Sequence, residues 1–163
     1  MSQLRAPLLI ACAAVLGTAC TSSEEEEAAL RAQAAAIHDS TLTIDSHDDI
    51  SFQFATDSVD PLNADRQVTL ERMREGGLDV AFFIAYVGQT EKTPLNYVRA
   101  RGDALTKFNA IHRMAEDLYP ELIEIAYSAD DVVRINNAGK LVAAIGIENG
   151  YVIGRDLALL ADY

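Results

Sequence analysis

Cysteine is almost absent from this sequence. The two that occur, Cys12 and Cys20, both lie within the first twenty residues. The rest of the chain therefore offers no thiol for a disulfide framework or for a thiolate metal site. Any metal ion bound there must be held by nitrogen and oxygen atoms.

Basic residues are also scarce. The chain has 13 Lys and Arg against 25 Asp and Glu, which gives a formal net charge of −12. Binding to nucleic acid needs clustered Lys and Arg that displace counterions from the phosphates, and no basic stripe occurs here. A nucleic-acid partner is therefore excluded. Half of the residues are hydrophobic, which is typical of a folded globular protein.

No apolar run is long enough to span a bilayer. The stretch from Ala6 to Ala19 has about 14 residues, fewer than the roughly 20 that a spanning helix needs. With Arg5 before it and small residues at its end, it predicts an export signal over residues 1–19. Cys20 follows directly, and a polar, acidic stretch comes next. Cys20 resembles the acylated cysteine of a bacterial lipoprotein, although Gly17 replaces the Leu that usually lies three residues before that cysteine.

The expected location is therefore the bacterial cell envelope. Lipidation at Cys20 would anchor the exported protein to the membrane, with residues 20–40 forming a tether and a leading helix. Secretion without an anchor and an incidental role for Cys20 are the alternatives.

Strand and helix patterns alternate along the remaining chain. Apolar runs indicate strands, and three- and four-residue spacing of apolar side chains indicates helices. We predict strands at 41–45, 78–87, 122–126 and 141–147 and helices at 28–38, 68–75, 97–119 and 129–138, with a long loop at 51–65 and another helix starting at 156. Asn96 and Ser128 are the predicted N-caps of two of these helices. The alternation predicts an α/β fold with a parallel sheet.

Three residues with metal-binding side chains follow strands of this predicted sheet. His47 and Asp49 come after the first strand, and Glu148 after the last. The carboxyl ends of parallel strands are where α/β enzymes place their sites, and residues two apart in a strand point the same way. An imidazole and carboxylates together suit Zn²⁺. Taken singly, each of these residues also fits a helix cap or a solvated turn.

Three segments resemble one protein family. Residues 44–50 (IDSHDDI) resemble the amino-terminal metal motif of membrane (renal-type) dipeptidases, which are amidohydrolase-like (β/α)₈ barrels. Residues 111–114 with 118–121 resemble a helix-ending signature of that family, and 145–150 (IGIENG) its strand and turn with a bridging glutamate. Asp48 and Asn149 depart from the family, which commonly has Asn and Gly there.

The resemblance implies an enzyme that hydrolyses dipeptides with two Zn²⁺ ions. His47 and Asp49 would bind one ion, and Glu148 would bridge both and so be catalytic. Further ligands, including a histidine pair, would come from later strands, because His38 and His112 lie on predicted helices. A (β/α)₈ barrel needs about 250 residues. Residues 41–163 are therefore expected to form an incomplete, inactive N-terminal portion of a TIM-like barrel.

Other interpretations remain open at this stage. A non-catalytic binding lipoprotein of the cell envelope would retain the half fold without zinc, and a related metal-dependent amidohydrolase would act on other amides. The expected partners are a dipeptide substrate and the membrane, and a homodimer remains open for a full-length protein.

Overall fold

The computed structural model describes residues 23–161 and 163. The predicted export signal and Cys20 lie outside these residues. The chain divides into two units, residues 1–36 and residues 37–163. Helix α1 (Ser23–Asp39) begins in the first range and ends in the second, and none of its residues is buried. Among the described residues, no helix has both the length and the apolar character needed to cross a bilayer.

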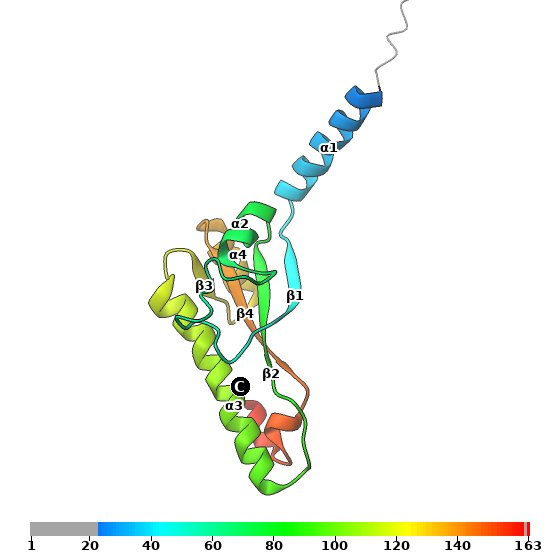
Figure 1. Cartoon of the computed structure of the whole chain (residues 1–163). Coiled ribbons are helices and arrows are strands. Elements are labelled where there is room, and N and C mark those ends of the chain that lie inside the picture. Colours follow the sequence, from blue (N-terminus) through cyan, green and yellow to red (C-terminus); the bar gives the residue numbers. More distant parts are fainter. Residues whose placement is uncertain (1–22, 162) are drawn as a thin grey trace, which may run out of the picture. The chain divides into compact units, whose positions relative to one another are not determined.

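The second unit contains a four-stranded parallel sheet, as the alternating pattern predicts (Figure 1). Its strands are β1 (Ile44–Asp49), β2 (Val80–Tyr86), β3 (Ile123–Ile125) and β4 (Leu141–Glu148). Their spatial order is β1-β2-β4-β3, so β4 lies next to β2, and the short β3 pairs with only the first residues of β4.

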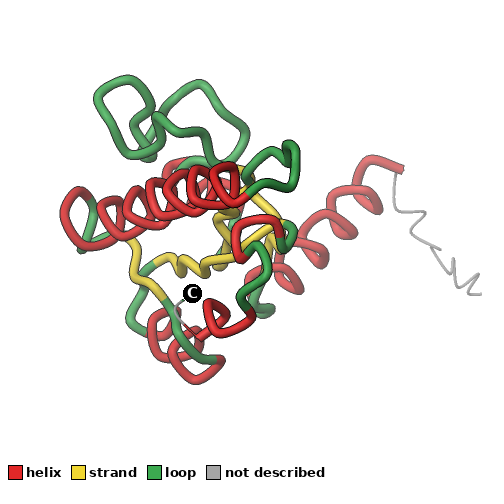
Figure 2. The backbone as a smooth tube through the Cα atoms, turned by 90° about the horizontal axis from the view of Figure 1, so that it is seen from below, coloured by secondary structure: helices red, strands yellow, loops and turns green. Residues whose placement is uncertain are grey.

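Helices cover both faces of this sheet, which parallel strands require. One face packs against α2 (Leu70–Gly76), α3 (Pro94–His112) and the π-helical turn η1 (Arg113–Leu118), with Phe83, Met73 and Ile111 in the core. Figure 2 shows α3 lying along this side of the sheet. On the other face, Ile135 of α4 (Ala129–Asn137) packs against Val80 and Val142.

The loop between β1 and α2 contributes to the core. As predicted, it is long, but Phe54 is only 1% exposed and its ring centroid lies 5.7 Å from that of Phe83. The loop is therefore packed against the face of the sheet that α3 covers.

Several predicted boundaries are wrong. His47 and Asp49 lie inside β1 instead of after it, because β2 continues to pair with Asp48 and Asp49. The N-cap of α3 is Thr93 instead of Asn96: the Thr93 hydroxyl accepts from the Asn96 N–H, and Pro94 begins the helix. The helix predicted from residue 156 is the short 3₁₀ turn η3 (Leu157–Ala161), and another such turn, η2 (Tyr151–Ile153), lies before it.

The buried face of α3 includes two small side chains. Val98 and Leu105 are exposed, whereas Ala100, Ala104 and Ile111 are buried. The two alanines let Tyr151 and Val152 of η2 pack closely against the helix. Small side chains at the point of contact therefore decide which face is inside.

Candidate metal centre

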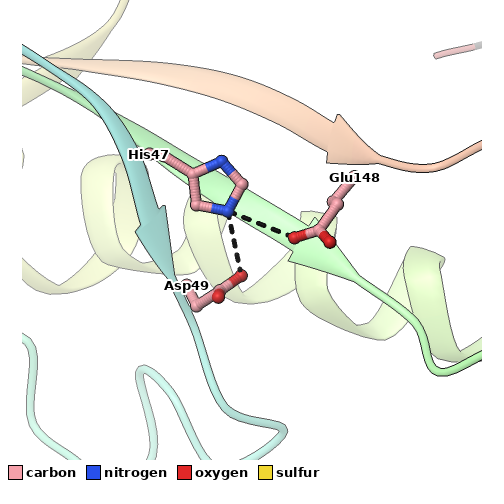
Figure 3. Close-up of side chains that lie close together, drawn as sticks. All are labelled: His47, Asp49 and Glu148. Carbon is pink, nitrogen blue, oxygen red and sulfur yellow. Dashed lines mark ion pairs between the residues drawn. The ribbon is translucent and has the colours of Figure 1, made fainter.

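His47, Asp49 and Glu148 lie together at the carboxyl ends of β1 and β4 (Figure 3). Strand β2 runs between these two strands, so their backbones are about 10 Å apart. The His47 imidazole reaches over β2 toward Glu148. Ile84 pairs with both Asp49 and Gly146, and a Cβ at Gly146 would stand 2.5 Å from Ile84 Cδ1, so the end of the isoleucine side chain uses the space that glycine leaves.

The distances within this cluster suit a small cation. His47 Nε2 lies 3.2 Å from Glu148 Oε2 and 3.6 Å from Asp49 Oδ1, and all three ligand atoms lie within 4.8 Å of one another. Ligands bound to one tetrahedral Zn²⁺ at about 2.0–2.2 Å lie roughly 3.3–3.6 Å from each other. Each side chain is about half exposed, so solvent can supply a fourth ligand. The donor set therefore fits zinc.

A β-bulge gives β1 its local shape. Asp45 pairs with Ala81 and Asp48 with Phe83, so three steps along β1 match two steps along β2. The His47 N–H lies inside the bulge and donates to Asp45 Oδ1 at 2.9 Å. Asp45 therefore supports the segment that carries His47.

Asp48 lies between the two predicted ligands but is not part of the cluster. It is 8% exposed and its carboxylate accepts two hydrogen bonds from the Arg66 guanidinium. Burial raises the pKa of Asp48 to about 6, and the Arg66 charge acts in the opposite direction. The Asp48 carboxylate is therefore bound to Arg66.

The other residues discussed from sequence have structural contacts. Asn149, which stands where the family commonly has glycine, takes the left-handed conformation with φ of 66°. His38 Nε2 lies 3.1 Å from the carbonyl oxygens of Gly76 and Gly77. His112 pairs with Glu116 within one helical stretch at 2.7 Å. Both histidines lie on helices, as predicted, and outside the cluster.

Two further residues near the cluster were not selected from sequence. Tyr86 ends β2 in register with Glu148, on the same face of the sheet, and is 41% exposed. Lys107 of α3 is only 5% exposed, and burial lowers the pKa of its amine while the charge of Asp49 raises it. Tyr86 could have been selected from sequence, because it lies at the end of a predicted strand. Lys107 could not, because the sequence does not show that a lysine in this helix is buried.

The structure also has a cavity away from the cluster of His47, Asp49 and Glu148. It has a volume of about 460 Å³ and lies between α3 and the sheet, with Phe108, His112, Tyr127 and Ile145 among its lining residues. The three clustered side chains do not line it. The cluster is therefore separate from this cavity, and its side chains are about half exposed.

Known proteins that are similar to this chain include several described as dipeptidases. The profile of the family described as Membrane dipeptidase (Peptidase family M19) matches residues 31–163. Dipeptidase 3 from Mus musculus is 34% identical over 142 residues, which are 82% of this chain and 27% of that protein. Dipeptidase ataJ from Aspergillus terreus is 30% identical over 98 residues, 58% of this chain and 24% of that protein.

One solved structure has the same fold. The crystal structure of the probable dipeptidase PvdM from Pseudomonas aeruginosa superposes with a TM-score of 0.74 at 24% identity, over 83% of this chain and 35% of that chain. The chain thus spans about a quarter to a third of the length of these relatives. Its α/β sheet corresponds to part of a larger fold, consistent with part of a TIM barrel.

Proposed function

This chain belongs to the membrane dipeptidase family, peptidase family M19, and on that premise we propose that it carries the first part of the zinc site of a dipeptide hydrolase. The observation that carries the proposal is the approach of His47 to both carboxylates at 3.2 and 3.6 Å. The metals of such a site lower the pKa of water and polarise the carbonyl group of the substrate.

The side chains divide the work of binding the metals. His47 supplies a neutral nitrogen donor, and Asp49 supplies a negative charge from the same face of β1. Glu148 has two carboxylate oxygens, and Oε2 lies 3.2 Å from His47 Nε2. Glu148 can therefore hold a second cation close to the first and offset part of their repulsion. We assign it the bridging role.

The described residues provide only part of a two-metal site. Within residues 23–161 and 163, His47, Asp49 and Glu148 form the one group of three such ligands. We therefore expect the chain by itself to bind one Zn²⁺ ion and to hydrolyse dipeptides slowly or not at all.

Zinc titration by calorimetry tests this proposal. We expect one Zn²⁺ per chain, and we expect His47→Ala to abolish binding because it removes the central donor. His112→Ala is the matched control, since His112 also pairs with a glutamate but outside the cluster. Equal loss of zinc in both variants, or a folded wild-type chain without zinc, would contradict the proposal. The latter result would favour the non-catalytic binding module. Rapid turnover of dipeptides by the zinc-loaded chain would show that its ligand set is already sufficient.

We also propose that the protein is exported and anchored through Cys20. Support comes from Arg5, the apolar stretch and the small residues before Cys20. Labelling with a fatty-acid analogue in a bacterial host is the test. Cys20→Ala should remove the label and Cys12→Ala should keep it, whereas label on both variants would place the acyl chain elsewhere.

A further inference from the structure

Arg66 holds the segment of β1 that carries the proposed ligands. It lies in the loop between β1 and α2, and its Nη2 donates to Asp48 Oδ1 at 2.8 Å and to Oδ2 at 2.7 Å. The same nitrogen donates to the backbone carbonyl oxygen of Asp49 at 3.0 Å. One guanidinium thus contacts both the side chain of one residue and the main chain of the next.

The surroundings of Arg66 keep this contact in place. The side chains of Arg66 and Asp48 are 15% and 9% exposed. The guanidinium carbon lies 4.9 Å from the centre of the Phe54 ring, and Phe54 is itself part of the core. A charged pair shielded in this way is screened little by salt, and removing one partner leaves a buried, uncompensated charge.

The contact lies where the sheet itself gives the least support. The bulge between Asp45 and Asp48 interrupts the regular pairing of β1 with β2, and the His47 N–H within it donates to Asp45 Oδ1. Successive side chains of a strand point to opposite faces. Fixing the Asp48 side chain on the α3 side therefore directs His47 and Asp49 toward Glu148. It also keeps the Asp48 carboxylate away from the metal site, where it could compete as a ligand.

We propose that Arg66 is a positioning residue for the zinc site, acting through Asp48 and the Asp49 carbonyl. The proposal rests on the proposed function, because it assigns Arg66 a role in holding His47 and Asp49 ready for zinc. It goes further in naming a residue that touches neither metal nor substrate. Changes in residues that orient metal ligands typically lower metal affinity about 10–100-fold.

The test compares zinc affinity by calorimetry and the visible spectrum of the Co²⁺-substituted chain. Arg66→Lys keeps the positive charge but replaces the planar guanidinium with an ammonium on a shorter side chain, which changes the contacts to Asp48 and to the Asp49 carbonyl. We expect it to weaken zinc binding at least tenfold and to alter the Co²⁺ spectrum. Arg134→Lys is the control, since Arg134 pairs with Glu124 and Asp131 on the surface. It should leave affinity and spectrum unchanged.

A second variant covers the case in which Arg66→Lys does not fold. The double change Asp48→Asn with Arg66→Gln leaves no buried charge and should fold, yet it loses the charged contacts made by Arg66 Nη2, so zinc affinity should again fall. If a folded Arg66 variant binds zinc as tightly as the wild type and gives the same Co²⁺ spectrum, the positioning role is wrong and the metal site stands. If the wild-type chain binds no zinc, the metal site is wrong and the role of Arg66 falls with it.

Discussion

Glu148 is the residue on which the two proposed metal positions depend. It is the last residue of β4, and its side chain is 42% exposed. Glu148→Gln removes the charge and retains the shape. We expect zinc affinity to fall roughly a hundredfold or more, since even indirect changes cost about 10–100-fold. The free energy of unfolding without metal should change by less than about 0.5 kcal/mol, because exposed ion pairs contribute little.

Glu116→Gln is the control for this prediction. Glu116 also pairs with a histidine, at 2.7 Å, but His112 and Glu116 lie outside the cluster. Calorimetry and urea unfolding on both variants separate binding from stability. Equal zinc affinity in Glu148→Gln and the wild type would contradict the bridging role.

At this scale, the sequence could identify the proposed ligands but not the residues that contact the segment around them. His47, Asp49 and Glu148 could be selected because they are metal-binding types at strand ends. Asp45 and Arg66 could not, since their roles depend on a bulge and on a loop that returns to the strand. Neither feature has a local sequence signal. Hydrogen bonds across 17 or 18 positions appear only after folding.

At the scale of elements, Gly77 shows how one turn holds α2 and β2 together. It caps α2 with φ of 66°, and a Cβ there would lie 2.6 Å from His38 Nε2. Gly77→Ala should therefore lower the free energy of unfolding by about 1–2 kcal/mol, since side chains disfavour this conformation. Gly102→Ala is the matched control. Gly102 lies within α3 with nothing within 4 Å of its Cβ position, so the change should raise stability by up to about 1 kcal/mol. Urea unfolding measures both, and a loss at Gly102 equal to that at Gly77 would contradict the argument.

Tyr119 joins the end of η1 to the loop after β1. Its hydroxyl donates to Asp60 Oδ1 at 2.5 Å. Burial, and then this hydrogen bond, raise the pKa of Tyr119 from 10.0 to about 12. The folded chain thus holds this proton more tightly than the unfolded chain. The stabilisation is present below pH 10 and declines as the pH rises to about 12.

Tyr119→Phe should therefore cost about 1 kcal/mol at neutral pH. The difference in unfolding free energy between wild type and variant should shrink between about pH 10 and 12. Denaturant unfolding across this range is the measurement. A difference that stays constant would mean that the hydroxyl titrates alike in the folded and unfolded states.

Element types were easier to predict than their ends. Ser128 was identified as the N-cap of α4 because its hydroxyl and the acidic first turn are both local signals. The N-cap of α3 was missed because Thr93 and Asn96 are both good caps, and the choice follows from Pro94, which fits the first turn. The end of β1 was missed because polar residues there are held by pairing with β2.

At the scale of the whole molecule, the alternating pattern predicted the parallel sheet but not its order. Strand β3 is the edge strand next to β4, and its three residues pair with Leu141, Val142 and Ala143. Among the described residues, the rest of β4, from Ala144 to Glu148, has a strand partner on one side only. This arrangement depends on pairing between distant segments, and the number and types of predicted elements do not determine it.

The sheet face that carries His47, Asp49 and Glu148 also exposes apolar side chains. Ile44, Phe82 and Tyr86 are 55%, 37% and 41% exposed, and the register places them on the same face. Only the beginning of this face is covered by α4. Exposed apolar groups next to a partly unpaired strand favour association with another surface.

We therefore expect the 163-residue chain on its own to self-associate as its concentration rises. Sedimentation velocity should show a growing average mass, and Phe82→Thr should reduce it, because threonine suits a strand but buries less apolar surface. Val98→Thr is the control, since Val98 is 69% exposed on α3, away from this face. If both variants and the wild type sediment as the same monomer at all concentrations, these apolar side chains do not drive association. If Val98→Thr reduces association as strongly as Phe82→Thr, the contact lies on the helical side instead.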